Sequence, residues 1–308
     1  MPQREPPRGD SQLDLFVAVF ADIPIRDQRD MMERPFFSLA KNPRVKPIEY
    51  KVGETWVEVS SNPQFGMATI WDADILIWAA TQLTEARDRG METSPTIRFL
   101  PYDLLKAIRR GTSGQDYRDL RSALTRLAGT LVRTNIRATG RRKTAVFHWL
   151  ESWSEIIDEV KQESRGITLT LPQWLYHGIL QQGGVLTIDP DYFLITGGVE
   201  RWMYRVARKH AGHQELGWQF TMRQLYEKSG SLARFSDFAI DIRKIVAGDH
   251  LPEYALDIER NEEGTEIVSI TPRENLSPDD PRSVSPKHIR RRFARGINSR
   301  PLKLGGAA

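Results

Sequence analysis

Apolar residues recur along the chain with two periods, and each period predicts one kind of element. Spacings of three and four residues predict six helices, over residues 69–90, 101–108, 115–129, 197–212, 221–230 and 234–248. Alternating apolar and polar residues predict three hairpins, over residues 47–60, 132–150 and 254–270. Short extended pieces surround Phe99 and Phe220. The pattern therefore predicts an α+β fold.

The same order of elements occurs twice. Residues 69–150 and 197–270 both read as helix, extended piece, helix, helix and hairpin. The third helices have apolar residues at the same i, i+4, i+7 spacing, namely Leu120, Leu124 and Leu127 in one copy and Phe238, Ile242 and Ile245 in the other. This order is typical of the winged helix, a helix-turn-helix followed by a β-hairpin wing. We therefore expect two tandem winged-helix domains. A generic α+β pair with no role in DNA binding is the alternative.

Four segments follow from this interpretation. Residues 1–11 are polar and proline-rich and read as a disordered arm, and residues 12–155 hold the first winged helix with the hairpin at its start. Residues 156–272 hold the second winged helix. Residues 273–308 form a basic tail, expected to be a mobile, non-specific DNA arm or else a short docked helix.

Charge is distributed unevenly, although the net charge is only +4. Residues 97–150 contain 12 Lys and Arg against 3 Asp and Glu, whereas residues 151–196 contain 2 against 7. A basic block of this size in a balanced protein indicates a polyanionic partner. A solvated basic face is the alternative.

The helix expected at 115–129 has the polar face that DNA reading requires. Opposite its apolar stripe it places Gln115, Arg118, Ser122 and Thr125, and this face is flanked by Arg121 and Arg126. Arg pairs with guanine edges, Gln with adenine, and Ser and Thr with bases or phosphates. The hairpin that follows, expected to be the wing, has Arg141, Arg142 and Lys143 at its tip and Arg133 on a strand. We expect these residues to contact double-stranded DNA, although an ordinary solvated helix face has the same composition.

The second copy has a different charge pattern. Its hairpin turn contains Glu262 and Glu263, which phosphates repel. Positive charge lies on one face of the helix at 197–212, which we expect to cross the DNA backbone through Arg201, Arg205 and Arg208. The helix at 234–248 is expected to offer a few further contacts, from Ser236, Arg243 and Lys244.

Composition and motifs exclude several other classes of protein. The chain has no cysteine, which excludes disulfides and thiol chemistry and fits a reducing cytoplasm. It has no apolar run long enough for a membrane helix and no signal-peptide pattern. The GRRKT sequence at 140–144 lacks the glycine loop of an ATPase, and His210 and His213 have no third metal ligand in the sequence. We therefore predict a protein that is not an enzyme and needs no cofactor or metal.

Whole blocks of the sequence resemble a known family. IPIRDQRDMMERPFFSLAKNPRVKPIEY, FGMATIWDADILIWAATQL, RFLPYDLLKAIRRGTSGQDYRDLRSAL and FTMRQLYEKSGS resemble the replication initiator protein A family of bacterial plasmids, over roughly residues 12–260. More distantly, the chain resembles tandem winged-helix plasmid initiators. The resemblance implies binding to repeated origin DNA, opening of the origin, and recruitment of the host initiator and replicative helicase. It also implies a homodimer in some states. A transcriptional repressor built on the same domains, and an adaptor with no specific DNA site, are the alternatives.

A short segment near the start of the chain raises a separate question. QLDLF at 12–16 resembles the peptide by which bacterial replication proteins bind the sliding clamp. By that resemblance, Gln12 supplies amide hydrogen bonds, and Leu13, Leu15 and Phe16 are the apolar anchors. The alternative is a first strand that packs on the first domain.

Overall fold

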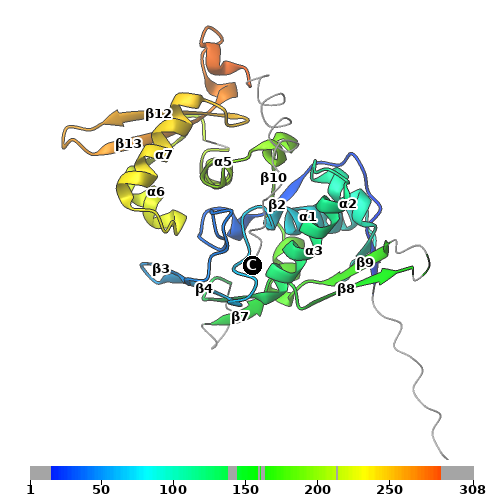
Figure 1. The fold of residues 1–308 in the computed structure, drawn as a ribbon. Coiled ribbons are helices and arrows are strands. Elements are labelled where there is room, and N and C mark those ends of the chain that lie inside the picture. Colours follow the sequence, from blue (N-terminus) through cyan, green and yellow to red (C-terminus); the bar gives the residue numbers. More distant parts are fainter. Residues whose placement is uncertain (1–14, 138–143, 159, 161–163, 213, 286–308) are drawn as a thin grey trace, which may run out of the picture.

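The computed structural model describes residues 15–137, 144–158, 160, 164–212 and 214–285. Over these residues the chain is a mixed α+β protein with seven α-helices and four β-sheets. Most helices belong to two units with the same order of elements. Figure 1 shows the first unit in cyan to green and the second in yellow to orange, with their terminal hairpins extending in opposite directions.

The first unit contains three helices, one single strand and a hairpin. In chain order these are α1 (Ala73–Asp88), β5 (Thr96–Phe99), α2 (Pro101–Ala107), α3 (Gly114–Gly129), β8 (Ser152–Ile157) and β9 (Ser164–Thr170). A capping box between Ser113 and Asp116 starts α3, whose buried stripe is the predicted one. The strand β9 pairs with both β5 and β8, and β1 (Phe16–Val17) adds to β5 in parallel.

The second unit repeats this arrangement. Its elements are α5 (Gly198–His210), β11 (Trp218–Thr221), α6 (Met222–Ser229), α7 (Phe235–Gly248), β12 (Tyr254–Arg260) and β13 (Glu266–Pro272). The single strand β11 pairs with the second hairpin strand β13, as β5 pairs with β9 in the first unit. Phe220, Leu225 and Phe238 are buried, as the repeat in the sequence predicts.

The hairpin predicted to be the first wing forms, but it belongs to another sheet. It consists of β6 (Thr130–Thr134) and β7 (Ala145–His148), and β6 pairs with β4 (Thr55–Ser61), which pairs with β3 (Ile48–Val52). The hairpin that pairs with β5 is β8–β9, in the place that β12–β13 has in the second unit. The prediction of the wing was therefore wrong, because strand pairing depends on contacts outside the local sequence. The expected boundary at residue 155 also fails, since it falls inside β8.

The chain between the two units forms ordered structure. After β9 come α4 (Gln173–Leu180), β10 (Val185–Thr187) and a 3-10 helix, Pro190–Leu194. The strand β10 pairs antiparallel with β2 (Arg26–Gln28), which precedes another 3-10 helix, Arg29–Met31. The chain before the first unit is therefore joined to the chain before the second.

Part of the expected basic tail packs on the second unit. Residues 273–285 include two 3-10 helices, Arg273–Asn275 and Pro281–Ser283. Arg273 is buried, and its guanidinium donates hydrogen bonds to the Asp249 carboxylate and to the carbonyls of Leu251 and Arg282. The expectation of a mobile arm is thus wrong for residues 273–285, and residues 286–308 lie outside the described part of the chain.

Candidate nucleic-acid interface

The outer face of α3 holds the exposed polar residues that the sequence predicts. Gln115, Arg118 and Ser122 are exposed, one turn apart. Gln115 accepts hydrogen bonds from the Arg118 guanidinium (2.8 Å) and donates one to Asp119 (2.7 Å). Ser122 donates to the Arg118 carbonyl at 3.0 Å. The Gln115 amide and the Arg118 guanidinium are therefore held side by side on the surface of the helix.

The flanking arginines of α3 are held in ion pairs. Arg121 forms two hydrogen bonds with Glu155 of β8, at 2.6 and 3.0 Å, and this bonding raises the pKa of its guanidinium. Arg126 forms two hydrogen bonds of 2.7 Å each with Asp72, the residue before α1. Burial alone would lower the pKa of Arg126, but Asp72 outweighs it and raises that pKa. These two side chains fix α3 against its neighbours, and Thr125 bonds the Arg121 carbonyl.

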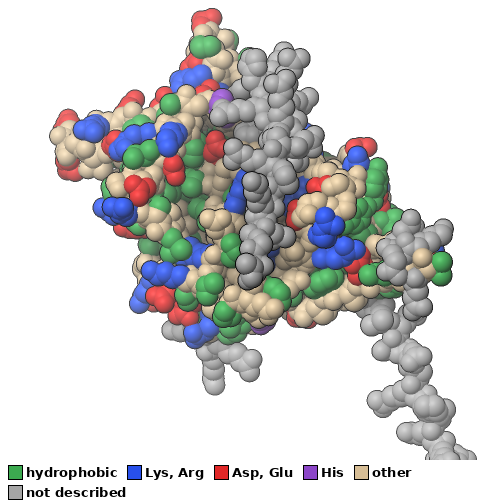
Figure 2. Space-filling view, viewed as in Figure 1, with side chains coloured by type: hydrophobic (Ala, Val, Ile, Leu, Met, Phe, Trp, Pro, Cys, Tyr) green, Lys and Arg blue, Asp and Glu red, His purple; other side chains and the backbone are tan. Residues whose placement is uncertain are grey.

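The β6–β7 hairpin contributes one described cation of the predicted set. Arg133 is exposed and lies 2.6 Å from Glu58 of β4. The three tip residues, Arg141, Arg142 and Lys143, lie outside the described residues. Figure 2 shows Lys and Arg side chains over the region of α2 and α3, whereas basic and acidic side chains are interleaved around α7 and β12–β13.

The predicted DNA face of α5 points into the protein. Arg201 is 3% exposed and pairs with Asp74 of α1 at 2.7 Å, and Arg205 is 1% exposed and pairs with Asp27 of β2 at 2.7 Å. Arg208 is partly exposed and donates to the Thr187 carbonyl at 2.5 Å. The assignment of Arg201 and Arg205 to DNA was wrong, because these side chains are anchored to buried carboxylates. They join α5 to the first half of the chain.

The predicted residues of α7 are exposed. Ser236 lies in its first turn, and Lys244 lies 3.6 Å from Asp241 on the same helix. Arg243 forms two hydrogen bonds with Glu266 of β13, at 3.1 and 2.7 Å. Arg223 of α6 was not predicted from the sequence. It is exposed, and its guanidinium lies 3.9 Å from the centre of the Phe235 ring. A basic residue in the first turn of the helix before α7 was the signal that could have indicated it.

The QLDLF segment is only partly described. Gln12 and Leu13 lie outside the described residues. Leu15 is 37% exposed, but Phe16 is 5% exposed and pairs with Ile97 of β5. The Phe16 ring lies 6.5 Å from that of Phe20. Phe16 therefore packs on the first unit in this structure.

The described residues include neither a metal site nor a membrane helix. In this part of the chain, no group of three or more His, Cys, Asp or Glu side chains is placed to hold a metal ion. No helix that the structure describes is long and apolar enough to cross a membrane.

Comparison with known proteins identifies the family. The pattern of the family described as "Replication initiator protein A" matches residues 26–256. The chain belongs to this family. Its sequence is also 34% identical over 234 residues to a protein of Wigglesworthia glossinidia brevipalpis named provisionally as a replication protein, covering 74% of this chain and 83% of that protein. The resemblance drawn from the sequence is thus confirmed, and QLDLF lies outside the matched residues.

Two crystal structures of domains 2 and 3 of RctB have a similar fold. The first aligns with a TM-score of 0.57 at 14% identity, covering 78% of this chain and 96% of that one. The second aligns with a TM-score of 0.53 at 13% identity, covering 77% and 94%. The arrangement of the two units therefore recurs in a protein of very different sequence.

Proposed function

We propose that this member of the replication initiator protein A family binds origin DNA through two winged helices and starts replication there. The observation that carries the proposal is the repeated unit. Both units have the order helix, strand, helix, helix, hairpin, with the β6–β7 hairpin inserted after α3 in the first unit. In both, the single strand pairs with the second strand of the hairpin. In such a unit the third helix enters the major groove. The reading helices are then α3 and α7.

The chemistry of α3 suits direct reading of bases. The exposed Arg118 guanidinium can bond a guanine edge with two hydrogen bonds, and the Gln115 amide can do the same with adenine. In the free protein the Gln115 amide oxygen accepts from the Arg118 guanidinium, and its amide nitrogen donates to Asp119. Binding therefore exchanges these local hydrogen bonds for contacts with bases. Arg121 and Arg126 hold the helix in place through Glu155 and Asp72.

The second unit offers a more modest interface. Ser236, Lys244 and Arg223 are exposed on α7 and α6, where they can contact bases and phosphates. Its hairpin turn contains Glu262 and Glu263, both exposed, so this turn is a poor phosphate ligand. We expect the first unit to supply most of the sequence discrimination and the second to add affinity.

Further steps of initiation belong to the same proposal. Bound at repeated origin sequences, the protein helps to open the adjacent duplex and recruits the host initiator and replicative helicase. It forms a homodimer in one of its states. The QLDLF segment is the proposed contact with the host sliding clamp. The chemistry of opening and loading belongs to those partners, and this chain acts by binding rather than as an enzyme.

One experiment separates initiator from repressor. A plasmid that carries the DNA flanking this gene as its only candidate origin is introduced with the gene supplied in trans. An initiator makes replication depend on the protein and gives repeated footprints on that DNA. A repressor gives footprints and a change in expression, but the plasmid replicates without the protein. An adaptor gives no protected repeats.

A further inference from the structure

A segment of the chain ahead of the first unit contacts both units. Residues 26–38, which we name the strap, begin with β2, which pairs with β10 and packs on α1. Phe36 and Phe37 of the strap pack on Trp149, the residue after β7, with ring centres 5.5 and 4.8 Å apart. This side of the strap is therefore anchored in the half of the molecule that contains α3.

The other side of the strap is anchored in the second unit by two carboxylates, Asp27, which pairs with Arg205 of α5, and Glu33. Glu33 is 5% exposed and lies 2.8 Å from Lys209 Nζ, 2.7 Å from His210 Nε2 and 3.0 Å from Lys228 Nζ. Lys209 and His210 end α5, and Lys228 is in the last turn of α6. Burial alone would raise the pKa of Glu33, but its bonds with His210 and Lys209 and the nearby charges lower that pKa well below its ordinary value.

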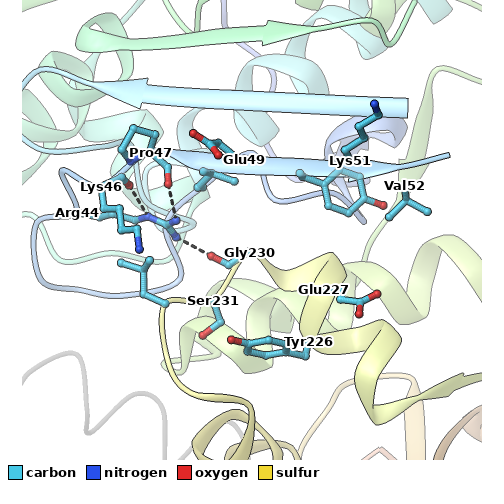
Figure 3. Close-up of a pocket in the computed structure, with 13 residues that line it drawn as sticks. Arg44, Lys46, Pro47, Glu49, Lys51, Val52, Tyr226, Glu227, Gly230 and Ser231 are labelled. Atoms are coloured by element: carbon cyan, nitrogen blue, oxygen red, sulfur yellow. Dashed lines mark hydrogen bonds between the residues drawn. The ribbon is translucent and has the colours of Figure 1, made fainter. Parts of the chain in front are cut away.

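The turn that leads from α6 into α7 lies against Arg44 and the start of β3 (Figure 3). Gly230 has φ of +60°, and a Cβ on it would meet Pro35 of the strap at 2.5 Å. On the other side Arg44, which is buried, donates to the carbonyls of Gly230 (2.7 Å), Lys46 (2.9 Å) and Pro47 (3.1 Å). The end of α6, and with it the turn into α7, is thus held between the strap and the start of β3.

We propose that Glu33 is a positioning residue that, together with the Asp27–Arg205 pair, fixes the separation of α3 and α7, and so sets the spacing at which the protein reads two DNA segments. Glu33 forms ion pairs with Lys209 of α5 and Lys228 of α6, and also with its neighbour in the strap, Arg34. Without its charge, Arg34 of the strap faces Lys209 and Lys228 without their shared anion. Repulsion then loosens α6, the helix before α7, from the strap, whereas Arg205 and Asp27 still hold α5. The inference rests on the proposed function for its consequence on DNA, but not for the geometry.

The geometry can be tested without DNA. Because the chain has no cysteine, Ser122→Cys on α3 and Ala247→Cys on α7 place two spin labels at exposed sites. We expect one narrow distance distribution, which broadens in Glu33→Gln. The matched control is Glu58→Gln, which removes the same charge from the exposed pair with Arg133 and leaves the distribution narrow. An equally narrow distribution in Glu33→Gln and in the control overturns the inference.

A second variant covers the case in which Glu33→Gln does not fold. Lys228→Met removes one of the cations and leaves Glu33 with Lys209 and His210. We expect a partial broadening of the distance distribution in a protein with an unchanged circular dichroism spectrum. A distribution identical to that of the control then counts against the inference.

The consequence for DNA uses two footprinted segments and inserted base pairs. An insertion of about 5 bp, half a helical turn, puts the second segment on the opposite face of the duplex and should weaken wild-type binding about tenfold or more. Glu33→Gln should bind both spacings within about twofold of each other, because its second unit can follow the DNA. Equal sensitivity to spacing in both proteins overturns the inference. Absence of any two-segment footprint contradicts the proposed function instead, while the label distances still decide the role of Glu33.

Discussion

Arg205 and Asp27 lie 178 positions apart in the sequence and form two hydrogen bonds, of 2.7 and 3.1 Å, at a site closed to solvent. Burial raises the pKa of Asp27, and the charge of Arg205 opposes that shift. The pair joins α5, the first helix of the second unit, to the strap. It explains why Arg205 lies on the buried side of α5.

Removing the cation of this pair should destabilise the protein. Arg205→Met leaves Asp27 buried without its partner, which costs about 3–5 kcal/mol of unfolding free energy. Asp27→Asn in the same chain should recover part of that loss, because the remaining group is neutral. Urea denaturation measures both. Arg133→Met, which breaks the exposed pair with Glu58, should cost at most about 1 kcal/mol. An equal loss of unfolding free energy in Arg205→Met and Arg133→Met would show that burial of the Arg205–Asp27 pair is not responsible.

Replacing the reading arginine of α3 should reduce discrimination between DNA sequences. Arg118→Ala removes an exposed guanidinium suited to a guanine edge, so the specific complex should lose about 1–3 kcal/mol while binding to scrambled DNA changes little. Fluorescence anisotropy on both DNAs measures the ratio. Arg89→Ala is the control, because Arg89 is exposed at the end of α1 and pairs with Glu85. A similar loss of the ratio in Arg89→Ala would remove the special role of α3.

The basic residues at the β6–β7 tip should act on all DNA alike. Changing Arg141, Arg142 and Lys143 together to Ala should weaken specific and non-specific binding by the same factor. It should also reduce the slope of log affinity against log salt by up to about 3, because each phosphate contact contributes about 0.9. A salt titration of both DNAs tests this. If the triple variant and Arg118→Ala changed the specific-to-non-specific ratio equally, the division between reading and anchoring would be wrong.

The helices, the hairpins and the repeat could be predicted because they follow from the spacing of apolar residues along the chain. Leu120, Leu124 and Leu127 are buried where their spacing places them, and the same holds for Phe238 and Ile242. These helices can be predicted from the nearby sequence alone. Strand pairing depends on segments far away in the sequence. For this reason the sequence predicted the β6–β7 hairpin as the wing, whereas the strand that pairs with β5 is β9.

The buried ion pairs were missed for a related reason. The apolar stripe of α5 predicts which side of the helix packs on the protein, but it does not predict that Arg201 and Arg205 are buried as well. The available signal was in α1, where Asp74 stands within a run of apolar residues. A buried carboxylate needs cations, and Asp74 has two, Arg110 and Arg201. Such partners become visible only when both helices are in place.

The contribution of Glu33 to stability should depend on pH in the acid range. Its pKa in the folded protein lies below the ordinary 4.5, so the stabilisation is fully present above that value and is lost as pH falls towards the folded pKa. Glu33→Gln should cost about 3 kcal/mol at neutral pH. The difference in unfolding free energy between the two proteins should shrink between about pH 5 and about pH 3, a range in which an ordinary His stays protonated. A constant difference over this range would show that the lost charge is not responsible.

The QLDLF segment gives a prediction that separates packing from partner binding. For Phe16 to enter a pocket on the sliding clamp, β1 must leave β5, because the ring is buried against the first unit. Detachment is feasible, since β1 has two residues and lies at the edge of its sheet.

Phe16→Ala should therefore lower the stability of the protein by about 3 kcal/mol of unfolding free energy, and it should also lower the affinity for the clamp. Leu15→Ala should lower clamp affinity and leave stability within about 0.5 kcal/mol, because Leu15 is exposed. Val19→Ala, also exposed and outside the motif, is the control for both measurements. If Leu15→Ala binds purified clamp as wild type does, the segment is only the first strand of the fold.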